Sequence, residues 1–143
     1  MREILFRGKD TDEHWQYGDY IRYNEEFCNI KDTTIYRHSH LCKTKTVGQY
    51  TGIDKNGTKI FEGDVITNKN KSYVFIVKIG EYNMCNSSCE SLFGVYLEAA
   101  DDMTKKSINI GLRVDILYWL LQEEYAVIGN IHDNPELLKE REK

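Results

Sequence analysis

Three potential metal ligands stand at every second position in one segment, His38, His40 and Cys42. On an extended strand, residues two apart project from the same face, so these side chains could converge. Cys85 and Cys89 could add two thiolates, and zinc prefers four nitrogen or sulfur ligands. The arrangement is unlike that of common zinc modules, whose closely spaced cysteine pairs recur in matching knuckles. We therefore predict no metal site and no cofactor.

Cysteine–histidine catalysis would pair a thiolate with a histidine that acts as its base. None of the candidate cysteines opens a clear helix, whose N-terminus would lower a thiol pKa. Paired carboxylates after a strand could bind Mg²⁺ or perform acid–base work, but the segment that follows them resembles a solvated loop. We therefore predict no catalytic residue and no enzyme. The candidate thiols are Cys42, Cys85 and Cys89, the candidate histidines are His14, His38, His40 and His132, and the candidate carboxylates are Glu98, Asp101 and Asp102.

Two short basic stretches could instead contact nucleic acid. Small β-barrels can stack bases on aromatic side chains between basic residues. The opposing interpretation is that the tyrosines are half-buried strand residues and that the lysines solvate sheet edges. The formal net charge of −4 also gives no overall basic character. The basic residues are Arg37, Lys43, Lys45, Lys69 and Lys71, with Tyr36, Tyr50 and Tyr73 nearby in the sequence.

Length and composition indicate one domain over residues 1–143. Aromatic residues make up 12% of the chain, which is enough apolar surface to fold without metal or disulfides. Four irregularly spaced cysteines do not resemble a disulfide scaffold. Neither a signal peptide nor a membrane span is evident, so we expect a cytoplasmic protein.

Many short strands with frequent turns predict a mainly β fold, a small SH3-like or partly open barrel. Asn56-Gly57 is a strong hairpin signal between strands near 47–54 and 58–61, and Val65 begins a third. Further strands are expected at 73–79, 93–97 and 125–131, whereas residues 24–34 are polar and are expected to form a loop. Residues 107–122 fit either a strand or a helix. A short helix is predicted over 134–142, with Asn134 as its cap and Pro135 at its first position.

Three motifs stand at the start, middle and end of this sequence. They are Arg2-Glu3-Ile4-Leu5-Phe6-Arg7 at the start, the segment from Gly48 to Asp64 in the middle, and the segment from Val127 to Leu138 at the end. These motifs resemble those of the YopX family of phage and prophage proteins, and the resemblance is specific because they span most of the chain in order. It implies a mobile-element origin and a β-rich fold, and it carries no reaction.

These observations favour a phage or prophage accessory protein without a catalytic site. We expect a homo-oligomeric β module that works through contacts with a host or phage protein, with strands in residues 1–46 packed on a β core of residues 47–132. The apolar run Leu117-Tyr118-Trp119-Leu120-Leu121 could contribute to the core or to an interface. The alternative is a phage regulator associated with nucleic acid.

Overall fold

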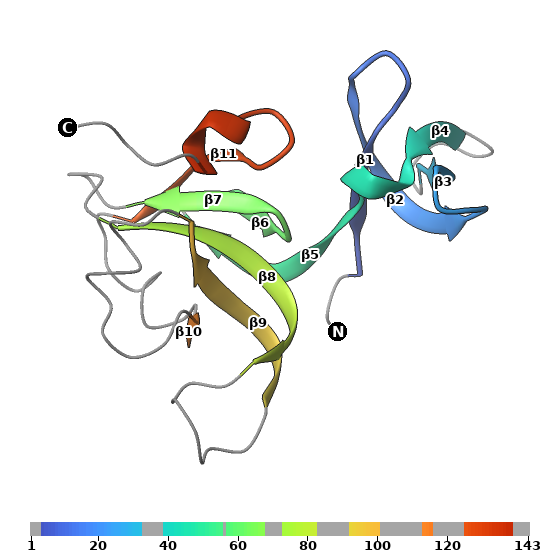
Figure 1. Ribbon diagram of the computed structural model, residues 1–143. Coiled ribbons are helices and arrows are strands. Elements are labelled where there is room, and N and C mark those ends of the chain that lie inside the picture. The colour runs from blue at the N-terminus through green and yellow to red at the C-terminus, as the bar shows by residue number, and fades with distance from the viewer. Residues whose placement is uncertain are drawn as a thin grey trace. The chain divides into compact units, whose positions relative to one another are not determined.

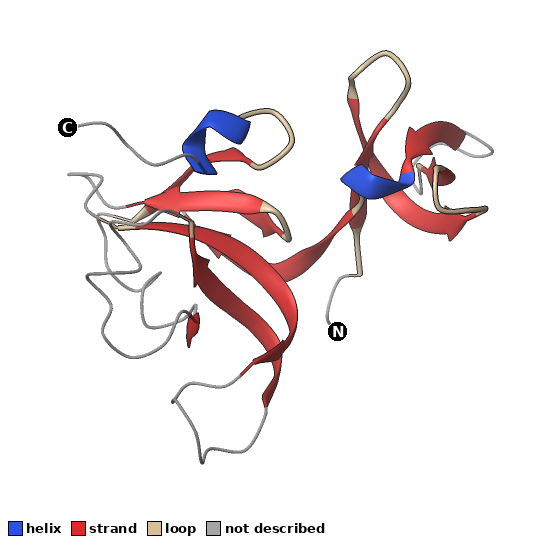
Figure 2. Cartoon of the chain, in the orientation of Figure 1, coloured by secondary structure: helices blue, strands red, loops and turns tan. Residues whose placement is uncertain are grey.

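The computed structural model describes residues 4–32, 39–55, 57–67, 73–82, 92–100, 113–115 and 125–138. The chain divides into two compact units, Met1–Phe61 and Glu62–Lys143. Each unit contains one antiparallel sheet (Figure 1 and Figure 2). The protein is therefore mainly β, as predicted. Among the described residues, no helix has the length and apolar character needed to cross a bilayer.

The sheet of the first unit has six strands in the order β4-β3-β2-β1-β5-β6. A single 3₁₀ turn, η1 (Thr44–Thr46), connects β4 to β5. One core cluster of this unit consists of Cys28, Ile30 and Cys42, against which Phe6, Tyr20 and Val47 pack. The strands are β1 (Phe6–Lys9), β2 (Trp15–Arg22), β3 (Phe27–Lys31), β4 (Ser39–Lys43), β5 (Gly48–Lys55) and β6 (Thr58–Phe61).

Strand β3 lies where the sequence predicted a loop over residues 24–34, so that prediction is wrong. Cys28 and Ile30 are fully buried, whereas the residues beside them are partly or fully exposed. This alternation is that of a strand with one buried face, but it covers only five residues within a polar segment. Asn24 closes the turn before β3, because its Oδ1 accepts hydrogen bonds from the amides of Glu26 (2.8 Å) and Phe27 (2.7 Å).

The β5–β6 hairpin confirms the strands predicted around Asn56-Gly57. Gly57 has φ +84°, a conformation that favours glycine, and Asn56 lies outside the described residues. The pairing of the two strands is interrupted between Tyr50 and Asp54. There the Thr51 hydroxyl donates to the carbonyl of Ile60 at 2.7 Å, which holds the irregular segment against β6.

The sheet of the second unit has five strands in the order β10-β9-β8-β7-β11. Its largest fully buried side chains include Phe75, Val77 and Leu97. Most of β8 pairs with β9, from Phe75 opposite Ala99 to Tyr82 opposite Leu92. The strands are β7 (Asp64–Thr67), β8 (Val74–Tyr82), β9 (Leu92–Ala99), β10 (Arg113–Asp115) and β11 (Ala126–Asn130).

The predicted small barrel is wrong, because strand pairing in the described residues produces two open sheets and no closed barrel. Closure requires the two edge strands of a sheet to pair with each other. The edges of the first sheet are β4 and β6, and those of the second are β10 and β11. In the first unit, β4 approaches β1 through one isolated bridge between Asp10 and Cys42. The packing of residues 1–46 on residues 47–132 stays a prediction.

The predicted C-terminal helix over 134–142 is also wrong. Asn134 precedes a single 3₁₀ turn, η2 (Pro135–Leu138), and residues 139–143 lie outside the described ranges. Asn134 Oδ1 accepts a hydrogen bond from the amide of Asn130 at 3.3 Å, so this side chain reaches back to the end of β11. Of the ambiguous residues 107–122, the structure describes β10 as a strand.

Candidate functional site

The structure describes two of the five candidate metal ligands. His40 and Cys42 lie in β4, whereas His38, Cys85 and Cys89 lie outside the described residues. Cys42 stands opposite Cys28 of β3, and both side chains are fully buried. In the described ranges, no group of three His, Cys, Asp or Glu side chains is placed to hold a metal.

The buried thiols are poor nucleophiles. Burial raises the pKa of Cys28, and it raises the pKa of Cys42 to about 11, with further contributions from Cys28 and Asp10. Because the thiolate is the reactive form, both cysteines stay in the unreactive protonated form at neutral pH. Among the candidate histidines, His14 is in the exposed β1–β2 turn and His132 follows β11.

The structure describes one of the three candidate carboxylates. Glu98 lies in β9, and its sequence neighbours Asp101 and Asp102 lie outside the described residues. Asp54 is opposite Lys59 in the β5–β6 hairpin and accepts a hydrogen bond from the Tyr50 hydroxyl.

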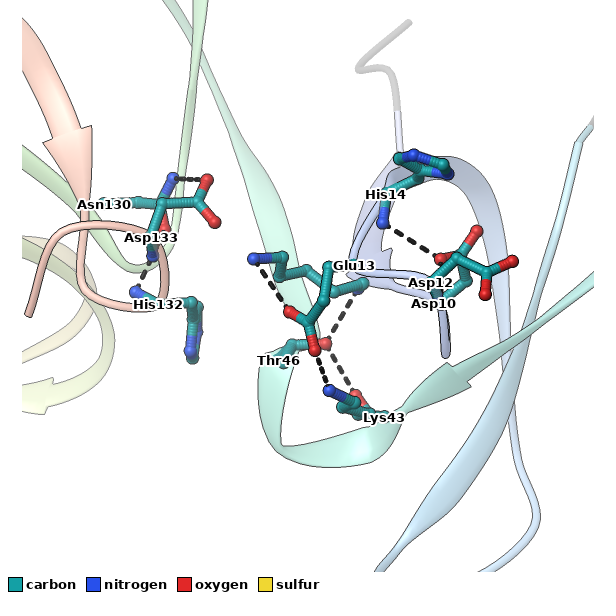
Figure 3. A network of polar contacts seen from close by, with 10 residues as sticks. Asp10, Asp12, Glu13, His14, Lys43, Thr46, Asn130, His132 and Asp133 are labelled. Carbon is teal, nitrogen blue, oxygen red and sulfur yellow. Dashed lines mark hydrogen bonds and ion pairs between the residues drawn. The ribbon is translucent and has the colours of Figure 1, made fainter.

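Lys43 is bound to a carboxylate from the β1–β2 turn. Its Nζ contacts Glu13, which also lies 3.1 Å from the Nζ of Lys9 (Figure 3). These contacts, first with Lys43 and then with Lys9, lower the pKa of Glu13. The Lys9 amide donates to the Thr46 hydroxyl at 2.8 Å, which joins β1 to η1. Of the other members of the two basic stretches, Lys45 is exposed in η1, whereas Arg37, Lys69 and Lys71 lie outside the described residues, as does Tyr36.

Asp10 organises the β1–β2 turn that presents Glu13. Its Oδ1 accepts hydrogen bonds from the amides of Asp12 and His14, both at 2.9 Å (Figure 3). Its Oδ2 accepts one from Gln16 Nε2 at 2.9 Å. The His14 amide and then Gln16 contribute most to the lowered pKa of Asp10. Glu13 adopts φ +66°, which is uncommon for a residue with a side chain. The turn therefore fixes the position of one carboxylate between two lysines.

Cations stack on aromatic rings across β2, β1, β5 and β6. The Arg7 guanidinium lies 4.6 Å from the Trp15 ring centre and 4.8 Å from that of Phe61. Lys9 lies 5.6 Å from the Trp15 ring centre, and Lys59 lies 4.6 Å from that of Tyr50. Because Arg7, Lys9, Tyr50 and Phe61 are buried, this cluster stabilises the sheet and presents few free ring faces for nucleobases. Tyr73, of the second unit, stacks on Phe75.

A row of three side chains, apolar in β2 and β4 and polar in β3, crosses one face of the sheet. Ile21 is opposite Asn29, and Asn29 is opposite Leu41, so the three side chains share one sheet face. Ile21 and Leu41 are 46% and 47% exposed, and Tyr23 is 60% exposed. The side-chain Nδ2 of Asn29 donates to the Tyr23 hydroxyl at 2.6 Å, which places the Tyr23 ring beside the row. We name Ile21, Tyr23, Asn29 and Leu41 the meander face; sequence reasoning did not identify it.

A groove of about 390 Å³ adjoins the meander face. It is lined by Glu25, Glu26, Phe27, Lys43 and Lys45. Phe27 of β3 stands opposite Lys43 of β4. Phe27 is two residues before Asn29, and Lys43 is two residues after Leu41. The groove and the meander face therefore lie on the same side of the sheet.

The last motif folds into a polar corner after β11 (Figure 3). Asn130 Oδ1 accepts hydrogen bonds from the amides of His132 (3.0 Å) and Asp133 (2.9 Å), and its Nδ2 donates to Asp133 Oδ2 at 3.1 Å. The Ile131 amide donates to the carbonyl of Gly63 at 2.9 Å, so the middle and last motifs meet within the second unit. Gly63 has φ +94°. The motif residues at this corner therefore hold a turn.

Comparison with known proteins places the chain in a family. A family model described as YopX protein matches residues 5–139. Comparisons with curated proteins and with solved structures each give no match. The matched range includes the hairpin of the middle motif and the corner of the last motif. The chain belongs to the YopX family.

Proposed function

We propose that this protein is a phage or prophage accessory protein without catalytic activity, which acts in the host cytoplasm through protein contacts and self-association. The meander face is the observation that carries the proposal. It exposes Ile21, Leu41 and Tyr23 on one sheet face around Asn29, and exposed apolar residues gathered on one face mark interaction surfaces. Two copies related by a two-fold axis would present the same face to each other, the usual arrangement in homodimers.

Two further features support protein contacts over other activities. The buried thiol of Cys42 is held protonated, which disfavours nucleophilic catalysis at that residue. Lys43 and Lys45 line a groove with two glutamates, and Lys43 is also bound by Glu13. These neighbouring carboxylates disfavour phosphate binding, and with it the alternative of a nucleic-acid-associated regulator.

Light scattering behind a size-exclusion column tests the proposal, with the ratio of absorbance at 260 and 280 nm recorded at low and high salt. We expect a defined oligomer with a protein-like ratio, and a monomer for the double variant Ile21→Ser and Leu41→Ser. The matched control replaces two exposed apolar residues of the second unit, Phe93→Ser and Ile128→Ser, and should keep the oligomer. A monomeric wild-type protein would refute self-association, and nucleic acid shed at high salt would support the regulator instead.

A further inference from the structure

The groove beside the meander face has rigid walls. The side chain of Asn24 fixes the turn over Glu25 and Glu26, and the Thr44 hydroxyl donates to the Asn24 carbonyl at 3.1 Å. The Thr44 amide also donates to the Glu26 carbonyl at 3.0 Å. The turn is thereby tied to Thr44 at the start of η1. A preformed site loses less conformational entropy on binding than a mobile one.

The charged groups around this groove differ in their contacts. Lys43 is held in an ion pair by Glu13, a carboxylate that it shares with Lys9. Within the part of the chain that the structure describes, the exposed carboxylates of Glu25 and Glu26 and the ammonium of Lys45 have no hydrogen-bond or ion-pair partner. The charged groups that can contact a ligand without breaking an ion pair are thus two carboxylates and one ammonium, and Phe27, half-buried between them, offers an apolar surface.

We infer that the groove binds an extended segment of a partner protein in which an arginine or lysine stands next to an apolar residue. The apolar side chain would pack on Phe27, and the cation would meet Glu25 and Glu26. The volume of about 390 Å³ is sufficient for such side chains. The inference rests on the proposed role in protein contacts and adds the chemistry of the partner. Continuity with the meander face extends the contact across the same side of the sheet.

Nuclear magnetic resonance titration of the full chain with two blocked peptides tests this inference. One probe is acetyl-Gly-Arg-Leu-Arg-Gly-amide, and the other replaces both arginines with glutamate. We expect the basic probe to shift the amide signals of Glu26, Phe27 and Thr44, and the acidic probe to leave them unchanged. Equal shifts with both probes, or no shift at Phe27 with the basic probe, would overturn the inference.

Charge variants locate the binding. The double variant Glu25→Gln and Glu26→Gln should weaken binding of the basic probe about three- to tenfold, as expected for the loss of exposed charge-assisted contacts. The control Glu81→Gln, an exposed carboxylate of the second unit, should leave binding unchanged. Unchanged binding by the Glu25/Glu26 variant would also overturn the inference.

The same samples separate this inference from the proposed self-association. Light scattering on the Glu25/Glu26 variant should still give the wild-type oligomer, because neither residue belongs to the meander face. Failure of the basic probe with an intact oligomer would remove only the groove as a binding site. Binding of the basic probe by a monomeric protein would uphold the groove and remove only self-association.

Discussion

A double-mutant cycle at Gly129 and Asn134 tests how the last motif holds its corner. A Cβ added to Gly129 would lie 2.3 Å from Asn134 Oδ1 and 3.3 Å from Asn134 Cβ. The shorter distance is far below a van der Waals contact, so the Asn134 side chain would have to rotate away. That rotation breaks the hydrogen bond of 3.3 Å that Asn134 Oδ1 accepts from the amide of Asn130.

Opposing contributions set the change in the free energy of unfolding that Gly129→Ala should cause. The lost hydrogen bond costs about 0.5–1.5 kcal/mol, and strain from overpacking adds about 1 kcal/mol or more. Replacing glycine with alanine within a strand returns about 0.5–1 kcal/mol. We therefore expect Gly129→Ala to lower the free energy of unfolding by about 0.5–2 kcal/mol in the wild-type background. After Asn134→Ala, the 2.3 Å contact no longer exists, and Gly129→Ala should raise the free energy of unfolding by about 0.5–1 kcal/mol.

Urea unfolding followed by circular dichroism, on the wild type, both single variants and the double variant, measures the coupling. Hydrogen exchange at the Asn130 amide reports the same effect locally. Gly57→Ala is the matched control, because Gly57 has φ +84° and nothing within 4 Å of an added Cβ. Its cost should come from backbone strain and be equal in both Asn134 backgrounds. Additive effects of Gly129→Ala and Asn134→Ala, within about 0.5 kcal/mol, would refute the contact.

Two further predictions concern buried thiols and acid stability. Cys28 and Cys42 should react with iodoacetamide at pH 8 much more slowly in the folded protein than in urea, because both are fully buried. Mass spectrometry of peptides measures the rates of alkylation, and equal rates in the two conditions would contradict the prediction. The lowered pKa of Asp10 means that its carboxylate stabilises the fold above its unfolded pKa of about 3.9, and that this contribution is lost as pH falls through the folded pKa. The urea midpoint of the wild type should therefore fall more between pH 7 and pH 3 than that of Asp10→Asn, and equal falls would contradict this assignment.

Local signals predicted most of the strands of this fold. The expected strands over 73–79 and 93–97 correspond to β8 and β9, because apolar and β-branched residues dominate both. Sheet membership could not be predicted in the same way. β5 follows β1 by about 40 residues in the sequence yet pairs with it, and such long-range pairing depends on register rather than on local pattern. The barrel was predicted because strand content alone does not distinguish one closed sheet from two open ones.

The candidate surface was hidden from sequence reasoning for a related reason. Ile21 and Leu41 lie in separate strands, and only the register through Asn29 brings them into one row. An isoleucine in an aromatic-rich strand is more often a core residue than an exposed one. Arg7 is the opposite case, a buried cation, because it stacks on the rings of Trp15 and Phe61.

The family motifs and the candidate surface occupy different parts of the described chain. Within the middle and last motifs, Tyr50, Thr51, Asn130 and Asn134 use their polar atoms in contacts inside the protein. Side chains engaged in this way define the fold and are poorly placed to bind another molecule. In the sequence, the residues of the meander face and of the groove come after the first motif and before the middle motif. Substitutions in the motifs should therefore change the free energy of unfolding, whereas substitutions of Glu25 and Glu26 should change binding and leave stability nearly unaltered.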